Sequence, residues 1–125
     1  MKIMRMRLFS SYAIERMITK ITEKLDRDRI NDYEVTDRVP KDVISIYPDP
    51  KCIKIYIPEE LEYSQYDIDD FIRSMVPYMR TSISMERDLY VMKVSGGNFN
   101  ENQLYKLVRY IIDETDFCSI INDEV

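Results

Sequence analysis

The densest group of residues that could do chemistry is an acidic stretch in the middle of the 125-residue chain. Residues 59–70 contain no basic side chain and hold these carboxylates: Glu59, Glu60, Glu62, Asp67, Asp69 and Asp70. Carboxylate oxygens are the ligands that magnesium and calcium prefer. The spacing lacks the central glycine and closing glutamate of an EF-hand loop, and acids are favoured in the first turns of a helix in any case. The sequence therefore predicts a structural role and no metal site.

A second reading of the same stretch is an acidic face that binds another protein. Its candidate residues are Glu59, Glu60, Glu62, Asp69 and Asp70. Such a face would suit a small acidic inhibitor of a host enzyme or defence system, which is the alternative function. Because contacts of this kind are electrostatic, high salt would weaken them.

One nuclease signature begins to match on the preceding segment. Pro48 and Asp49 resemble the opening of the PD-(D/E)xK pattern, which then requires an acid two residues before a lysine. Cys52 occupies that position before Lys54. A divalent-metal phosphodiesterase is therefore only the third-ranked function.

Several catalytic groups are missing from the composition. The chain has no histidine, so triads and imidazole-based zinc sites are excluded. Its only glycines, Gly96 and Gly97, are adjacent and cannot form a phosphate-binding loop. Cys52 and Cys118 are far apart in the sequence and are expected to be reduced thiols. We expect no enzyme, no cofactor and no small-molecule substrate.

The balance of charge and hydrophobicity limits the partners. The chain is 45% hydrophobic and 33% charged, with a net charge of −5. An acidic protein is a poor general binder of nucleic acid, because phosphate contacts dominate that affinity. No apolar run approaches the roughly 20 residues that span a bilayer, and residues 1–7 do not resemble a signal peptide. A protein partner, either a second copy or a larger assembly, is the remaining class.

The hydrophobic pattern predicts one domain, residues 1–125, that begins with a strand and a helix. Residues 2–9 alternate apolar and charged side chains, which predicts a half-buried strand. A stripe from Ile14 to Leu25 predicts an amphipathic helix over 11–28. Residues 29–42 are expected to be a connection with a short extended piece at 33–35.

The rest of the chain repeats one plan. Two ββα units are predicted, at 43–79 and 81–115, with equivalent positions 36 residues apart, and residues 116–125 are expected to be a tail. The expected order is β-α-β-β-α-β-β-α. The predicted class is α+β, with a single antiparallel sheet and helices on one face. It is either a ferredoxin-like core with an added strand and helix, or tandem ββα units.

Tyrosine is abundant, with ten residues and no tryptophan. Tyrosine is enriched where proteins meet, because it offers a large contact area and a polar tip. The alternation of the predicted strands places the candidate interface on the sheet face without helices, at Tyr47, Tyr56, Tyr90 and Met92.

Three stretches, MKIMRMRLFS, DRVPKDVISIY and YIPEELEYSQYDIDDFIRSM, resemble small proteins of tailed bacteriophages of the crAss-like group. The resemblance carries no functional motif. It implies a setting, which is the virion or the cytoplasm of an infected bacterium. Together with the missing catalytic groups, it predicts a non-catalytic interaction or assembly protein, such as a structural or accessory component of a phage particle.

Overall fold

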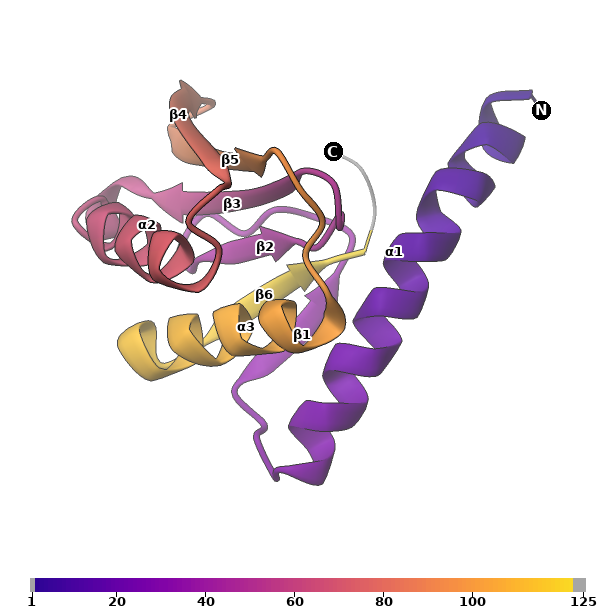
Figure 1. The fold of residues 1–125 in the computed structure, drawn as a ribbon, viewed down its shortest axis with the longest axis horizontal. Coiled ribbons are helices and arrows are strands. Elements are labelled where there is room, and N and C mark those ends of the chain that lie inside the picture. Colours follow the sequence, from indigo (N-terminus) through magenta and orange to yellow (C-terminus); the bar gives the residue numbers. More distant parts are fainter. Residues whose placement is uncertain (1, 123–125) are drawn as a thin grey trace.

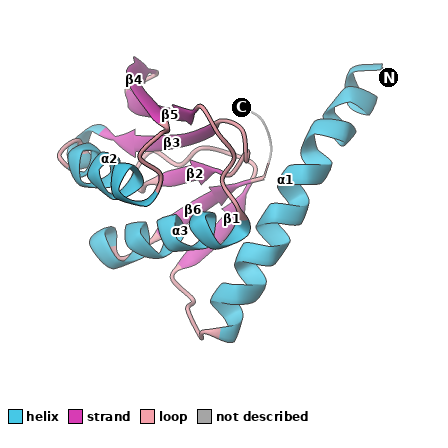
Figure 2. Cartoon of the chain, viewed as in Figure 1, coloured by secondary structure: helices cyan, strands magenta, loops and turns pink. Residues whose placement is uncertain are grey.

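The computed structural model describes the backbone of residues 2–122 and the side chains of residues 12–122. Three helices and one sheet make up this part (Figures 1 and 2). The helices are α1 (Lys2–Arg27), α2 (Ser64–Met75) and α3 (Glu101–Thr115), with a short 3-10 turn, η1 (Glu59–Leu61). The strands are β1 (Tyr33–Thr36), β2 (Ser45–Tyr47), β3 (Ile53–Pro58), β4 (Arg80–Glu86), β5 (Leu89–Ser95) and β6 (Cys118–Ile121). The α+β class is confirmed.

The sheet is mixed rather than antiparallel, which corrects the prediction. Its strand order is β1-β6-β2-β3-β5-β4. The pairs from β2 to β4 are antiparallel, whereas β6 runs parallel to both of its neighbours, β1 and β2. The parallel part arises because α3 crosses over the sheet before β6 begins, and a helical crossover brings the chain back in the same direction.

The predicted β-α-β-β-α-β order occurs, but in a different part of the chain. It runs from β3 through α2, β4, β5 and α3 to β6, and β2 lies between β6 and β3 in the sheet. The predicted start at residue 2 is wrong, because α1 is already helical from Lys2 and residues 2–9 form no strand. Methionine, leucine, arginine and lysine all favour helix, and no glycine or proline separates this segment from the amphipathic stripe.

The predicted tail contains a central strand. All four residues of β6 are buried, between β1 and β2. A short apolar run without polar alternation is typical of a strand that is covered on both faces. The extended piece expected at 33–35 is β1, the parallel partner of β6.

The two predicted ββα units correspond to β2-β3-α2 and β4-β5-α3. Helices α2 and α3 lie against one face of the sheet, which we call the helix face, and α1 packs against α3 (Figure 1). The ring of Phe71 in α2 stacks on that of Tyr110 in α3, with centroids 4.4 Å apart. Asn100 and Gln103 form a capping box at the start of α3.

The residues of β5 that face the helices differ by one position from those that the predicted spacing of 36 selects. Ile55 pairs with Met92 and Ile53 with Val94, so these residues share the helix face. Equivalent residues in the two strands are therefore 37 positions apart, whereas the helices keep the spacing of 36. Because side chains alternate along a strand, this single step transfers Val91 to the opposite face, which we call the back face.

Strand β5 carries apolar residues on both faces, so its hydrophobic pattern alone does not identify the face that the helices cover. Met92 is fully buried on the helix face, and Val91 is 1% exposed on the back face. The connection between β1 and β2 passes over the back face near this point, since Val39 and Val91 line the same cavity.

Candidate functional site

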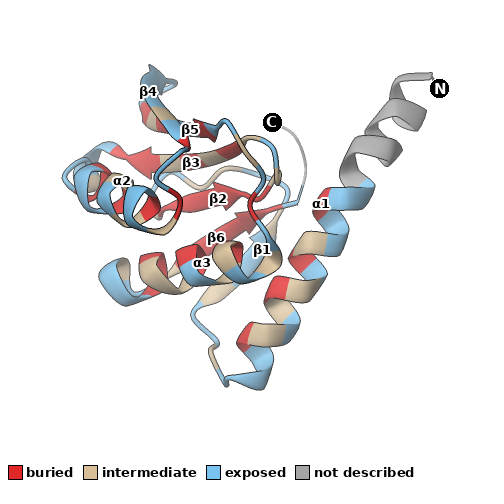
Figure 3. Cartoon of the chain, viewed as in Figure 1, coloured by how far each residue is buried: buried red, intermediate tan, exposed pale blue. Residues whose placement is uncertain are grey.

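Strand β4 is an open edge of the sheet. It pairs with β5 on one side, and no strand of the described residues pairs with its other side. Six of its seven residues are exposed, and Thr81 is half-buried. Figure 3 shows β4 largely as exposed, whereas the central strands are largely buried. A long free edge presents unpaired backbone N–H and C=O groups and can template pairing with another strand.

Local interactions hold this edge in place. Arg87 and Asp88 form the two-residue turn into β5, and both have positive φ angles, of 52° and 67°. From α2, the Asp69 carboxylate accepts a hydrogen bond from the Thr81 hydroxyl at 2.7 Å and pairs with Arg73 at 2.9 Å. The edge strand is thus fixed to the adjacent helix as well as to β5.

The outer strand carries apolar residues that no helix covers. Ile83 is 45% exposed and Met85 is 50% exposed, both on the helix face opposite Met92 and Tyr90. The Tyr90 hydroxyl donates to Glu62 at 2.8 Å. That hydrogen bond is the main cause that raises the pKa of Tyr90, so the phenol remains a donor at neutral pH. The exposed ring of Tyr66 extends this surface on α2.

The sequence of β4 is complementary to itself when read in the opposite direction. Its first residue is Arg80 and its last is Glu86, and Ile83 lies at the centre. In an antiparallel pair of two β4 strands centred on Ile83, each arginine faces a glutamate of the other copy. The remaining pairs would join Thr81 with Met85 and Ser82 with Ser84. No like charges would face each other.

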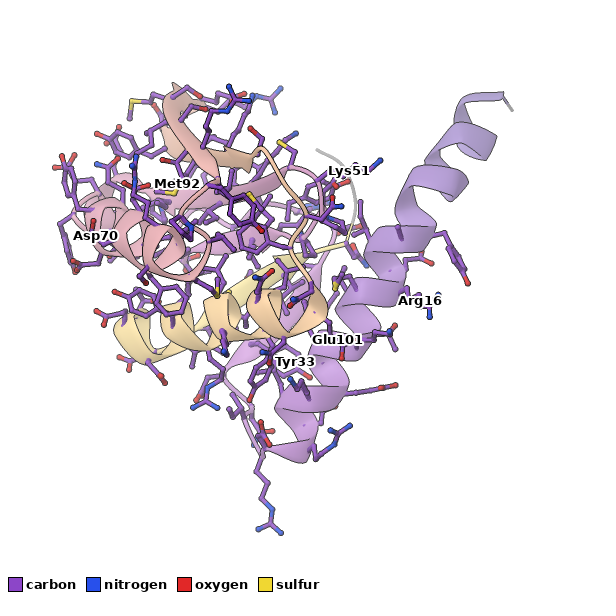
Figure 4. The ribbon with its side chains drawn as sticks, in the orientation of Figure 1. Arg16, Tyr33, Lys51, Asp70, Met92 and Glu101 are labelled. Carbon is purple, nitrogen blue, oxygen red and sulfur yellow. The ribbon has the colours of Figure 1, made fainter. Side chains whose placement is uncertain are left out.

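The four residues predicted as an interface do not share one surface. Tyr47 and Tyr56 lie on the back face, where Tyr47 pairs with Lys54 and Tyr56 with Ser45. Tyr90 and Met92 lie on the helix face, so their predicted placement on the uncovered face is corrected. Met92 is 0% exposed, among the side chains packed on the helix face (Figure 4). Tyr47 is also buried, so neither of these two side chains offers free contact area.

The acidic residues divide into two groups. Glu62 and Asp69 are used within the chain, by Tyr90 and by Arg73 with Thr81. Glu59, Glu60, Glu62 and Asp70 are exposed, whereas Asp69 is half-buried, and Asp70 lies on the outer surface of α2 (Figure 4). Four of the five predicted carboxylates therefore lie at the surface, and Asp69 is the one drawn into contacts with Arg73 and Thr81.

No group of three or more carboxylate or cysteine side chains in the described part is arranged to hold a metal ion. Within the same residues, no helix is long and apolar enough to cross a membrane.

Both cysteine thiols are free. Cys118 is fully buried, and burial raises the pKa of its thiol because the charged thiolate is disfavoured away from water. Since the thiolate is the reactive form, this thiol should react slowly. Cys52 is half-buried. We expect 5,5′-dithiobis(2-nitrobenzoate) to label only Cys52 in the native protein and to label Cys118 after urea unfolds the chain. Two rapidly labelled thiols under native conditions would contradict this arrangement.

The edge residues Ile83 and Met85 were not identified as functional from the sequence. Their alternation correctly predicts a strand, but an outer and an inner strand of a two-sided sheet have the same alternation. One feature of the sequence could have indicated an edge strand. The residues between the apolar ones in β4 are threonine or serine, so only one side of the strand is apolar.

The chain matches no protein-family model, and neither the curated proteins nor the solved structures contain a significant match to it.

Proposed function

We propose that this protein is a non-catalytic assembly protein whose copies join through their β4 edges. The observation that carries the proposal is an open seven-residue strand with exposed apolar residues and opposite charges at its two ends. The proposed setting is a phage particle or an infected cell, as the resemblance to phage proteins implies.

A second copy fits this edge better than an unrelated strand would. With Ile83 facing Ile83 of the second copy, all seven residues of each strand are paired and two Arg80–Glu86 contacts form. If one β4 strand is shifted by two residues along the other, fewer residues are paired and Arg80 no longer faces Glu86. In the centred register both copies keep their helices on the same side, so Ile83 and Met85 of the two chains form one continuous apolar strip.

The expected affinity is moderate. Stable interfaces bury about 1,200–2,000 Å² in total, and a single short ladder with few side-chain contacts covers less. We therefore expect a dimer with a dissociation constant on the order of micromolar, and hence a mass that depends on concentration.

Charge reversal tests the proposed pairing. Arg80→Glu places a glutamate opposite Glu86 at both ends of the ladder, and Glu86→Arg places an arginine opposite Arg80. Because like charges directly opposite each other in a ladder are unfavourable, each variant should weaken the dimer by roughly 10- to 100-fold. The double variant Arg80→Glu/Glu86→Arg restores opposite charges and should recover most of the affinity. Sedimentation equilibrium over a range of concentrations measures all four proteins.

Lys106→Glu is a matched control, since Lys106 is an exposed cation on α3 away from the edge. It should leave the dissociation constant unchanged. If the wild type remains a monomer at hundreds of micromolar, or if the double variant is as weak as the single variants, the proposed pairing is wrong.

A further inference from the structure

A cavity of about 370 Å³ lies on the back face, beside the Glu86 end of β4. It is bounded by the connection between β1 and β2 on one side and by the β4–β5 turn on the other. This volume falls in the range of small-molecule sites, roughly 300–1,000 Å³.

The floor of the cavity is apolar. Leu89 and Val91 come from β5, Tyr56 comes from β3, and Val39 comes from the covering connection. Leu89 is 8% exposed and Val91 is 1% exposed, so the floor is part of the packed body of the protein. An apolar ligand group placed here would remove these side chains and itself from water.

The rim carries an excess of positive charge. Arg38, Lys41 and Arg87 line it together with Asp37 and Glu86. In the part that the structure describes, ion pairs join Lys20 to Glu101, Arg73 to Asp69 and Arg109 to Asp113, so no carboxylate lies within ion-pair distance of the rim cations. The charge of an incoming anion would therefore not compete with an existing partner.

Two lysines on the back face, next to the cavity floor, add to the positive charge around the cavity. Lys54 and Lys93 lie directly opposite each other across β3 and β5, two positions from Tyr56 and Val91. The Lys54 ammonium lies 5.7 Å from the centre of the Tyr47 ring. Like charges facing each other in a ladder are unfavourable, and an anion nearby would relieve that repulsion. This pair is unexpected in a chain whose net charge is negative.

The turn at Arg87 adds a further indication. Two-residue turns with positive φ at both positions are normally built from asparagine and glycine, because other residues are strained there. Here the first position is an arginine at φ 52°, and its side chain lines the cavity. A cation is thus kept at the rim at some cost in backbone energy.

We propose that this cavity binds a small amphiphilic anion, with its apolar body on the floor of Tyr56, Leu89 and Val91 and its carboxylate or phosphate between Arg38 and Arg87. Arginine suits both anions, because its planar guanidinium can donate two parallel hydrogen bonds to them. The cavity shares Glu86 with the proposed edge pairing, but neither Arg38 nor Arg87 belongs to β4.

Calorimetric titration with octanoate and with octyl phosphate, each below its micelle concentration, tests the site. We expect saturable binding of at least one of them. Octanol lacks the charge and inorganic phosphate lacks the apolar body, so both should bind at least tenfold more weakly. The relative affinities of octanoate and octyl phosphate distinguish a carboxylate site from a phosphate site.

The double variant Arg38→Gln/Arg87→Gln should weaken binding of the amphiphile at least tenfold, whereas Lys106→Gln should leave the affinity unchanged. Methyl chemical shifts of Leu89 and Val91 should move on titration, while those of Leu104, a buried residue of α3, should not. The proposal is overturned if neither amphiphile binds, if the double variant binds as well as the wild type, or if the shifts map to another surface.

Discussion

Met92→Asp is expected to leave no folded protein at 25 °C. Met92 is 0% exposed on the helix face, and an aspartate there would be a buried carboxylate without a partner. Substitutions of this kind cost more than about 4 kcal/mol, out of a total stability of roughly 5–15 kcal/mol for a domain. Circular dichroism and the dispersion of amide proton shifts would show the loss of the fold.

The adjacent residue supplies the matched control. Lys93 is exposed on the back face, opposite Lys54. Lys93→Asp should change the free energy of unfolding by less than about 0.5 kcal/mol, or raise it slightly because the two lysines no longer face each other. A folded Met92→Asp protein together with an unfolded Lys93→Asp protein would show that β5 presents the opposite face to the helices.

This pair of residues also shows what the sequence could have revealed. The predicted spacing of 36 places Val91, and with it Lys93, against the helices. A lysine at a core position is a warning that the register is wrong, since lysine is almost never fully buried without a partner. Moving by one residue puts Lys93 in solvent and Met92 in the core, as the structure has it.

The elements with clear local signals were predicted well. Residues 101–115 form the helix of the second predicted ββα unit, and β2 and β3 form an antiparallel pair at the start of the first. The strand predicted at 2–9 failed because alternation of methionine and arginine over a few residues fits a helix as well. β6 was missed because a segment of four residues, one of them the polar Ser119, is too short to distinguish a buried strand from a tail.

The candidate surfaces depended on tertiary arrangement, which local patterns do not contain. That β4 is an edge follows from α2 and α3 carrying the chain across the sheet to either side of β3. The cavity on the back face depends on where residues 37–41 pass over the sheet. The sequence contains the charged residues of the β4 edge and of the cavity, but it does not show which residues lie beside them in the fold.

Cross-linking tests the proposed edge pairing most directly, because it reports which residues face each other. In a Cys52→Ser background, with buried Cys118 retained, Ile83→Cys should form a disulfide-linked dimer on mild oxidation. Directly opposite residues of antiparallel strands have Cα atoms about 4.5–5.5 Å apart, which suits a disulfide. Non-reducing electrophoresis and intact-mass spectrometry measure the yield.

Met85→Cys is the control on the same strand and the same face. In the centred register it faces Thr81 of the other copy, so two such cysteines lie about 13 Å apart along the strands and should not link. A mixture of Thr81→Cys and Met85→Cys chains should link to each other. The account predicts rapid linkage for Ile83→Cys and for that mixture, and little for Met85→Cys alone. Equal linkage at 83 and 85, or no linkage at any of these positions, would contradict it.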